Sequence, residues 1–262
     1  MEDVMGLPAV GVKVAAKRSR RRDLIEIAIG YILILIVIWT PRPWQRYFWL
    51  AAVLGIGIMI AASFDHPRSI GLRGGNFLGS LWVVVAALMA SAVSIAIAAR
   101  LNTLRSPAGP MDLIENFWSY AIWAGVQQFL LQCFFLTRLL RLIPKPRSAA
   151  LVAAGLFALA HLPNPVLSIL TIVWGTAACH IFLRYRNVYP LAIAHAILGI
   201  TIAISVPGHL DHNMRVGLGY LRYQKRWPLP PVQRSHRDQI ASTDAWVTAE
   251  AATRWPDRHA RP

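Results

Sequence analysis

The sequence predicts an all-α, polytopic transmembrane helix bundle with about seven spans. Only 15% of its 262 residues are charged and 56% are hydrophobic, whereas soluble domains carry roughly 25% charged residues. The apolar residues fall in long runs, several of which approach the roughly 20 residues that a membrane-crossing helix needs. Because a segment in lipid must satisfy its own backbone hydrogen bonds, each of these runs is expected to be helical.

The first predicted span, residues 24–40, follows the basic run KRSRRRD at the end of an N-terminal tail over 1–23. It has no small-residue cleavage site and two prolines follow it closely, so we expect a retained span rather than a signal peptide. The bundle is expected over 24–206, and the polar, basic segment 207–262 is expected to be a mostly disordered tail. The other candidate spans are residues 47–63, 77–99, 117–136, 149–162, 166–182 and 188–206.

The formal net charge of +15 lies mainly in the ends and loops, where it favours a cytoplasmic N-terminus and contact with lipid headgroups. Arg138 and Arg141 are expected in a loop on the same side as that terminus. Seven spans leave the basic tail 207–262 outside, so either this tail crosses the membrane or one span is re-entrant. The predicted location is the cell membrane, with a multi-pass topology and membrane lipids as partners. Nucleic acid is not expected as a partner, because no basic stripe is interleaved with aromatic residues.

Three carboxamides interrupt the apolar stretch WAGVQQFLLQCFF, at Gln127, Gln128 and Gln132. Gln127 falls near the middle of a hydrocarbon layer that is about 30 Å thick. An unpaired amide there costs several kcal/mol, so these groups must face protein or trapped water. Hydrogen bonds between helices are the simplest explanation for any one of them.

Two histidines lie at comparable depth in other predicted spans, His161 in FALAHLPNP and His195 in LAIAHAILG. Ionisable residues inside a membrane are rare and usually mark functional sites, although a single one is more often a satisfied packing residue. Together with the glutamines, they predict one polar cluster built from the fourth, fifth and seventh spans. His180 is expected near a helix end, outside this cluster.

The ordered arrangement of these residues over about 71–206 resembles the CPBP family of CAAX-processing and bacteriocin-processing intramembrane proteases. That family carries an EExxxR helix, then FxxxH, then HxxxN. Phe157 and His161 match the second motif, and His195 matches the histidine of the third. The resemblance implies an intramembrane endopeptidase in which a glutamate and the second-motif histidine activate water, while the third motif stabilises the oxyanion.

This sequence differs from the family pattern at the motif positions that have catalytic roles. QQFLLQ stands at EExxxR, and Gly199 stands where the third motif has asparagine. A carboxamide at Gln127 can orient water but cannot accept its proton, which leaves His161 as the sole base. His195 can still donate to an oxyanion, and Gly199 leaves room for a backbone or water donor. The expected catalytic residues are His161, His195 and Gln127, supported by a polar network of Gln128 and Gln132.

Several functions therefore remain open. One is an impaired endopeptidase that acts on a membrane-embedded or lipidated protein segment. Another is a catalytically inactive relative that binds such a segment in the same cavity. Haem or metal binding is a weaker alternative, because HExxH and zinc-type Cys/His spacing are absent, and no cofactor is expected. Transport is equally weak without symmetric halves. Cys133 and Cys179 fall in apolar segments and are expected to be small core residues.

Overall fold

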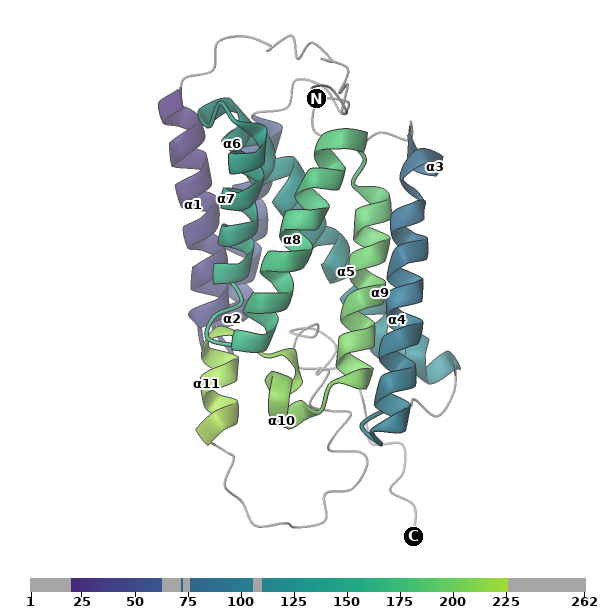
Figure 1. Cartoon of the computed structure of the whole chain (residues 1–262). Helices are drawn as coiled ribbons and strands as arrows, with labels where there is room; N and C mark the ends of the chain where they lie inside the picture. Colours follow the sequence, from purple (N-terminus) through teal and green to yellow (C-terminus); the bar gives the residue numbers. More distant parts are fainter. Residues whose placement is uncertain (1–19, 63–71, 73–75, 106–109, 226–262) are drawn as a thin grey trace.

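The computed structural model describes residues 20–62, 72, 76–105 and 110–225, and within these residues all regular structure is helical (Figure 1). This confirms the all-α class. The elements are α1 (Arg20–Trp39), α2 (Gln45–Ala61), α3 (Phe77–Ser80), α4 (Trp82–Arg100), α5 (Pro110–Phe129), the π-helix η1 (Leu130–Leu136), α6 (Thr137–Leu142), α7 (Pro146–Leu159), α8 (Pro165–Tyr185), α9 (Tyr189–Ser205), α10 (Gly208–Asp211), the 3-10 turn η2 (His212–Met214) and α11 (Gly217–Lys225).

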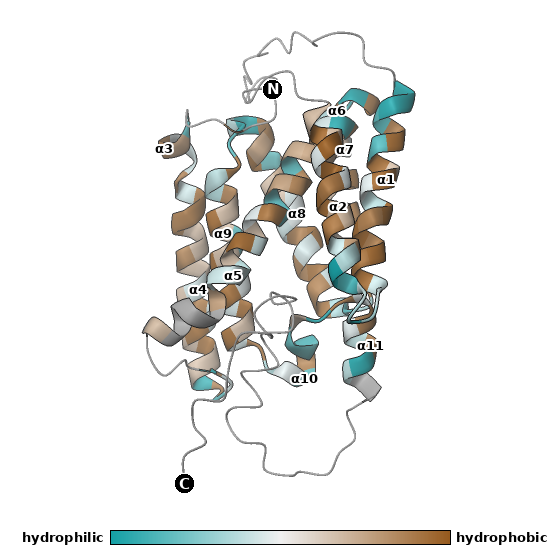
Figure 2. Ribbon diagram, turned by 180° about the vertical axis from the view of Figure 1, so that it is seen from behind, coloured by the Kyte–Doolittle hydropathy of each residue, from teal (hydrophilic) through white to brown (hydrophobic). Residues whose placement is uncertain are grey.

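The helices have the composition of a membrane protein. By length and hydropathy, Phe77–Arg100 and Pro165–Tyr185 can each cross a membrane, and a third candidate is α9 together with Gly208–Met214, which bend by 116°. Hydrophobic residues cover the helix middles, and hydrophilic ones gather at the outer end of α1, at α6 and at α11 (Figure 2). Each predicted span falls on a helix, while the count of seven membrane crossings stays a prediction.

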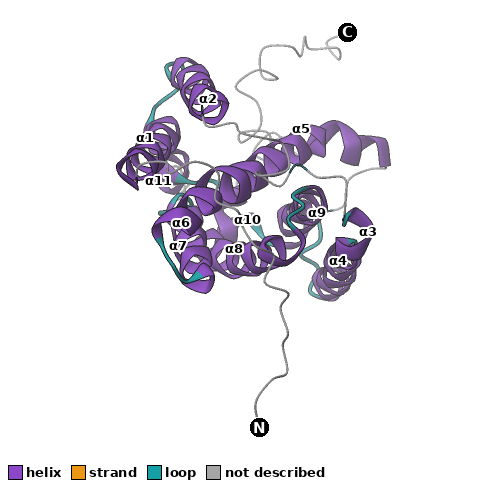
Figure 3. Ribbon diagram, turned by 90° about the horizontal axis from the view of Figure 1, so that it is seen from above, coloured by secondary structure: helices purple, strands orange, loops and turns teal. Residues whose placement is uncertain are grey.

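The packing of the bundle relies on small residues. Helix α7 packs against α8, and α9 packs against both α4 and α5 (Figure 3). On α7, Ala150 and Ala154 are fully buried, and a Cβ added at Gly175 of α8 would lie 3.3 Å from the Ala154 Cβ. Such small side chains let two membrane helices approach closely.

The break between α7 and α8 occurs at HLPNP, as the sequence predicts, and α8 begins at the second proline of this segment. Asn164 caps α8, because its Oδ1 accepts a hydrogen bond from the Leu167 N–H at 3.1 Å. Its Nδ2 donates to the carbonyl oxygens of Asp211 at 2.6 Å and Arg215 at 3.0 Å. A single buried side chain therefore joins the break to the segment that follows α9.

The beginning of the segment predicted as a C-terminal tail is helical, as α10, η2 and α11 (Figure 1). The Gly217 N–H donates to the Leu162 carbonyl at 2.9 Å, and Gly217 has a φ of +50°. A Cβ there would lie 2.3 Å from Ile38 Cγ2, so only glycine allows α11 to meet the end of α1 this closely. Residues 1–19 and 226–262, the rest of the two predicted tails, lie outside the described residues.

Two ion pairs join the start of α1 to α6. Both of their arginines were predicted to lie in a loop, and this prediction is wrong. Arg138 and Arg141 lie in α6, and α1 begins at Arg20, within the predicted tail. Arg138 Nη2 lies 2.7 Å from Glu26 Oε2, and Arg141 Nη2 lies 2.5 Å from Asp23 Oδ1. Sequence patterning missed the pairing because the partners are more than a hundred positions apart.

Arg141→Ala is expected to destabilise the bundle by roughly 3 kcal/mol, because it leaves the buried Asp23 carboxylate without its guanidinium. Thermal unfolding in detergent measures this loss. Arg22→Ala is the matched control, since Arg22 is 48% exposed and its i,i+4 pair with Glu26 is worth at most about 1 kcal/mol. Equal melting temperatures for the two variants would contradict a structural role for the Asp23–Arg141 pair.

Candidate active site

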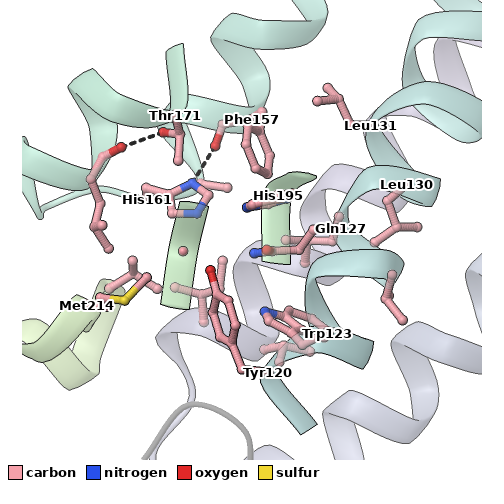
Figure 4. Close-up of a pocket in the computed structure, with 18 of the residues that line it drawn as sticks. Tyr120, Trp123, Gln127, Leu130, Leu131, Phe157, His161, Thr171, His195 and Met214 are labelled. Carbon is pink, nitrogen blue, oxygen red and sulfur yellow. Dashed lines mark hydrogen bonds between the residues drawn. The ribbon is translucent and has the colours of Figure 1, made fainter. Parts of the chain in front are cut away.

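A cavity of about 1280 Å³ opens between the helices of the bundle, and its walls include residues of α1, α2, α5, α7, α8 and α9. All three predicted catalytic residues line it, namely Gln127 from α5, His161 from just after α7 and His195 from α9 (Figure 4). Gln128 and Gln132 are fully buried behind the wall. The structure therefore separates the five predicted residues into a layer that faces the cavity and a layer that supports it.

The supporting layer is a chain of hydrogen bonds. Gln132 Nε2 donates to Gln128 Oε1 at 3.3 Å, and Gln128 Nε2 lies 3.1 Å from His195 Nδ1. Gln132 belongs to η1, where the α5 helix continues as a π-helix. Such π-segments occur frequently at functional sites, because the wider turn changes the direction of the side chains that follow.

The bond from Gln128 selects the tautomer of His195. With the amide oriented to donate its Nε2–H, His195 Nδ1 is the acceptor, so the single proton of the neutral ring lies on Nε2. The ring is 7% exposed and packs against Phe157, at 5.9 Å between ring centroids, and Trp174, at 6.1 Å. His195 is thus held as an N–H donor on the wall of the cavity.

His161 has the opposite tautomer. Its Nδ1 lies 2.7 Å from the Phe157 carbonyl oxygen, which can only accept, so Nδ1 carries the proton and Nε2 keeps its lone pair. The Phe157 ring packs edge-on against both imidazoles, at 4.8 Å from His161 and 5.9 Å from His195. Phe157 of the FxxxH pattern therefore orients one histidine through its carbonyl and packs against both with its ring.

The remaining predicted residue, Gln127, faces the cavity with a free amide. Within the described part of the chain, no side chain hydrogen-bonds to it, in contrast to Gln128 one position later. The amide is therefore available to a molecule in the cavity. This arrangement provides one acceptor at His161, one donor at His195, and one group at Gln127 that can do either.

Aromatic residues also form part of the site, and they were not predicted from the sequence. Tyr120 and Trp123 line the cavity together with Gln127 (Figure 4). Trp174 packs against His195, at 6.1 Å between ring centroids. Positions 120, 123 and 127 follow the i, i+3, i+7 spacing of one helix face, so this signal was present in the sequence. This spacing alone does not indicate a site, because aromatic residues in an apolar helix usually belong to the core.

Metal-type side chains do not gather in this cavity. Among the described residues, no three His, Cys, Asp or Glu side chains come together as a metal site requires. Cys133 and Cys179 lie in the apolar core with exposed fractions of 3% and 0%.

The family model of the type II CAAX prenyl endopeptidases, Rce1-like, matches residues 78–201 of this chain. The match begins in α3, ends in α9 and includes every glutamine and histidine of the site described above. No curated protein and no solved structure matches the chain. Over residues 78–201, the helical core of this chain is therefore similar to the Rce1-like family of type II CAAX prenyl endopeptidases.

Proposed function

We propose that this chain is an intramembrane endopeptidase that hydrolyses a peptide bond of a membrane-associated protein, at a rate reduced by the absence of a carboxylate base. The observation that carries this proposal is the pair of complementary histidines on one cavity. His161 presents a lone pair at Nε2, while His195 presents an N–H at Nε2. Hydrolysis of an amide needs a proton acceptor for the water and a donor for the oxyanion.

The proposed reaction begins with water held by the amide of Gln127. His161 Nε2 removes a proton from that water as its oxygen attacks the carbonyl carbon of the peptide. The negative charge that forms on the carbonyl oxygen is stabilised by the His195 Nε2–H. The His161 imidazolium then gives its proton to the leaving nitrogen, the C–N bond breaks, and the products are a carboxylic acid and an amine.

The proposed substrate is a membrane-embedded or lipidated segment. Apolar side chains from α1, α2, α5 and α8 make up most of the cavity wall, which suits a hydrocarbon chain. Four arginines also line the cavity, and they would attract an anionic group of such a substrate. They are Arg42, Arg105, Arg215 and Arg222.

We also propose seven crossings and a cytoplasmic N-terminus. The basic start of α1 and the basic helix α6 lie at the same end of the bundle (Figure 1), which supports one positively charged side. The short helices α2 and α7 would also cross, since a short span is accommodated by local thinning of the bilayer and by flanking side chains that reach its surface.

The competing proposal is a silent relative that binds such a segment without cutting it, and it is favoured by the amide at Gln127. The test uses proteoliposomes that contain the full chain and a panel of single-span and lipid-tailed reporter peptides, with products identified by mass spectrometry. A defined product made by the wild type and lost in His195→Ala supports the endopeptidase. Retention of a reporter without any product supports the silent relative, and equal products from both proteins would place the chemistry elsewhere.

A further inference from the structure

The position that follows His195 by one helical turn is Gly199, and both residues line the cavity. Four residues along an α-helix correspond to a rise of about 6 Å, so a side chain at 199 would project beside His195. In the HxxxN pattern this position carries a carboxamide, which Gly199 lacks. The donor capacity of the site is therefore reduced unless another residue supplies it.

The space beside Gly199 is occupied, contrary to the expectation that it leaves room for a backbone or water donor. A Cβ added at Gly199 would lie 1.8 Å from the hydroxyl oxygen of Tyr120 and 2.5 Å from its Cζ. The phenol of α5 thus lies where a side chain at 199 would begin. Glycine at this position is a condition for the observed place of Tyr120.

The Tyr120 hydroxyl points into the cavity, toward the two histidines (Figure 4). No hydrogen bond joins it to another side chain or backbone group in the described part of the chain. A hydroxyl in mainly apolar surroundings is stabilised only when it finds a partner. Its O–H is therefore available to an acceptor group on a molecule that enters the cavity.

We propose that the Tyr120 hydroxyl is the second oxyanion donor of the site and replaces the side chain missing at Gly199. This inference rests on the proposed endopeptidase function. The neutral phenol keeps its proton and donates an O–H hydrogen bond to the carbonyl oxygen as negative charge develops there. The His195 Nε2–H is the first donor, so two donors from α5 and α9 converge on one oxygen.

Tyr120→Phe is expected to lower kcat by about 10²–10³-fold with little change in KM, because it removes one donor and keeps the ring. Tyr189→Phe is the matched control, since Tyr189 is 45% exposed at the start of α9 and is not among the residues that line the cavity. Melting temperatures in detergent for both variants should equal that of the wild type. A Tyr120→Phe protein that cleaves at the wild-type rate would overturn the proposal.

A swap of the two side chains tests the geometry directly. Gly199→Asn alone is expected to lose activity and stability, because its Cβ collides with the Tyr120 phenol. In a Tyr120→Ala background, the same substitution should raise kcat about 10-fold or more above Tyr120→Ala alone, since the carboxamide supplies a new donor. Full activity and stability of Gly199→Asn would show that Tyr120 does not occupy this place.

Binding of a phosphonate peptide, which mimics the tetrahedral oxyanion, separates this inference from the proposed function. Tyr120→Phe should weaken phosphonate binding far more than binding of the matching uncleaved peptide. If the wild type never cleaves a reporter but shows this selective loss, the endopeptidase fails and the donor role stands. Equal phosphonate affinities for Tyr120→Phe and the wild type would remove the donor role even where cleavage is observed.

Discussion

His161→Ala is expected to lower the cleavage rate by about 10²–10⁴-fold while leaving the bundle folded. His161 provides an imidazole nitrogen with an available lone pair on the cavity, because its Nδ1 proton is held by the Phe157 carbonyl, whereas the lone pair of His195 Nδ1 already accepts from Gln128. The side chain follows the end of α7 and is only partly buried, so its removal leaves no large void in the core. Single-turnover cleavage of a reporter peptide in proteoliposomes measures the rate.

His180→Ala is the control for this variant. His180 makes the same local bond, from Nδ1 to the carbonyl oxygen four residues earlier at 2.8 Å, but it lies exposed on α8. The control should cleave at the wild-type rate and melt at the wild-type temperature. A His161→Ala protein as active as His180→Ala would show that another group accepts the proton.

The approximate positions of the helices and the grouping of three polar residues could be predicted from the sequence alone. Apolar runs of suitable length, ended by prolines such as those after His161, correspond closely to the observed helices. Because an unpaired polar group in hydrocarbon is unfavourable, Gln127, His161 and His195 were expected to face protein or water. These three residues line one cavity. They share this cavity although only His195 is buried, whereas Gln127 and His161 are partly exposed.

Which of two adjacent glutamines faces the cavity and which is buried could not be predicted in this way. Gln127 and Gln128 are neighbours in sequence, yet one faces the cavity and the other is fully buried against His195. This difference depends on the rotation of α5 about its axis and on its continuation as a π-helix. Both are decided by packing against other helices, which no local pattern encodes.

The place of Tyr120 depends on the same kind of long-range contact. The sequence shows a glycine at 199 and a tyrosine at 120, but only the crossing of α5 and α9 brings the phenol to the vacant position. The ion pair of Asp23 with Arg141 arises similarly, from two charged residues that each resemble surface residues. Contacts between side chains that are distant in sequence therefore could not be predicted, either in the site or in the rest of the bundle.

Gln127→Glu is expected to raise the cleavage rate by about 10²–10⁴-fold, because a carboxylate can accept the proton that a carboxamide cannot. The substitution changes few heavy-atom positions, and Gln127 has no hydrogen-bond partner among the described side chains to lose. The new charge would face the cavity that His161 also lines, and His161 can bear the compensating proton. Steady-state cleavage of the same reporter measures the gain, and a rate unchanged in a stable variant would favour the silent, segment-binding alternative.

Gln128→Glu separates the effect of position from the effect of charge. A carboxylate at 128 can only accept, so His195 Nδ1 would have to carry a proton, and in the neutral ring Nε2 would then lose its N–H. The rate should therefore fall, and the buried charge should also lower the melting temperature. Adding Gln132→Arg supplies a partner one turn away and should restore stability, because these two side chains already share a hydrogen bond. Equal gains from glutamate at 127 and at 128 would show that general electrostatics, rather than a positioned base, limits the reaction.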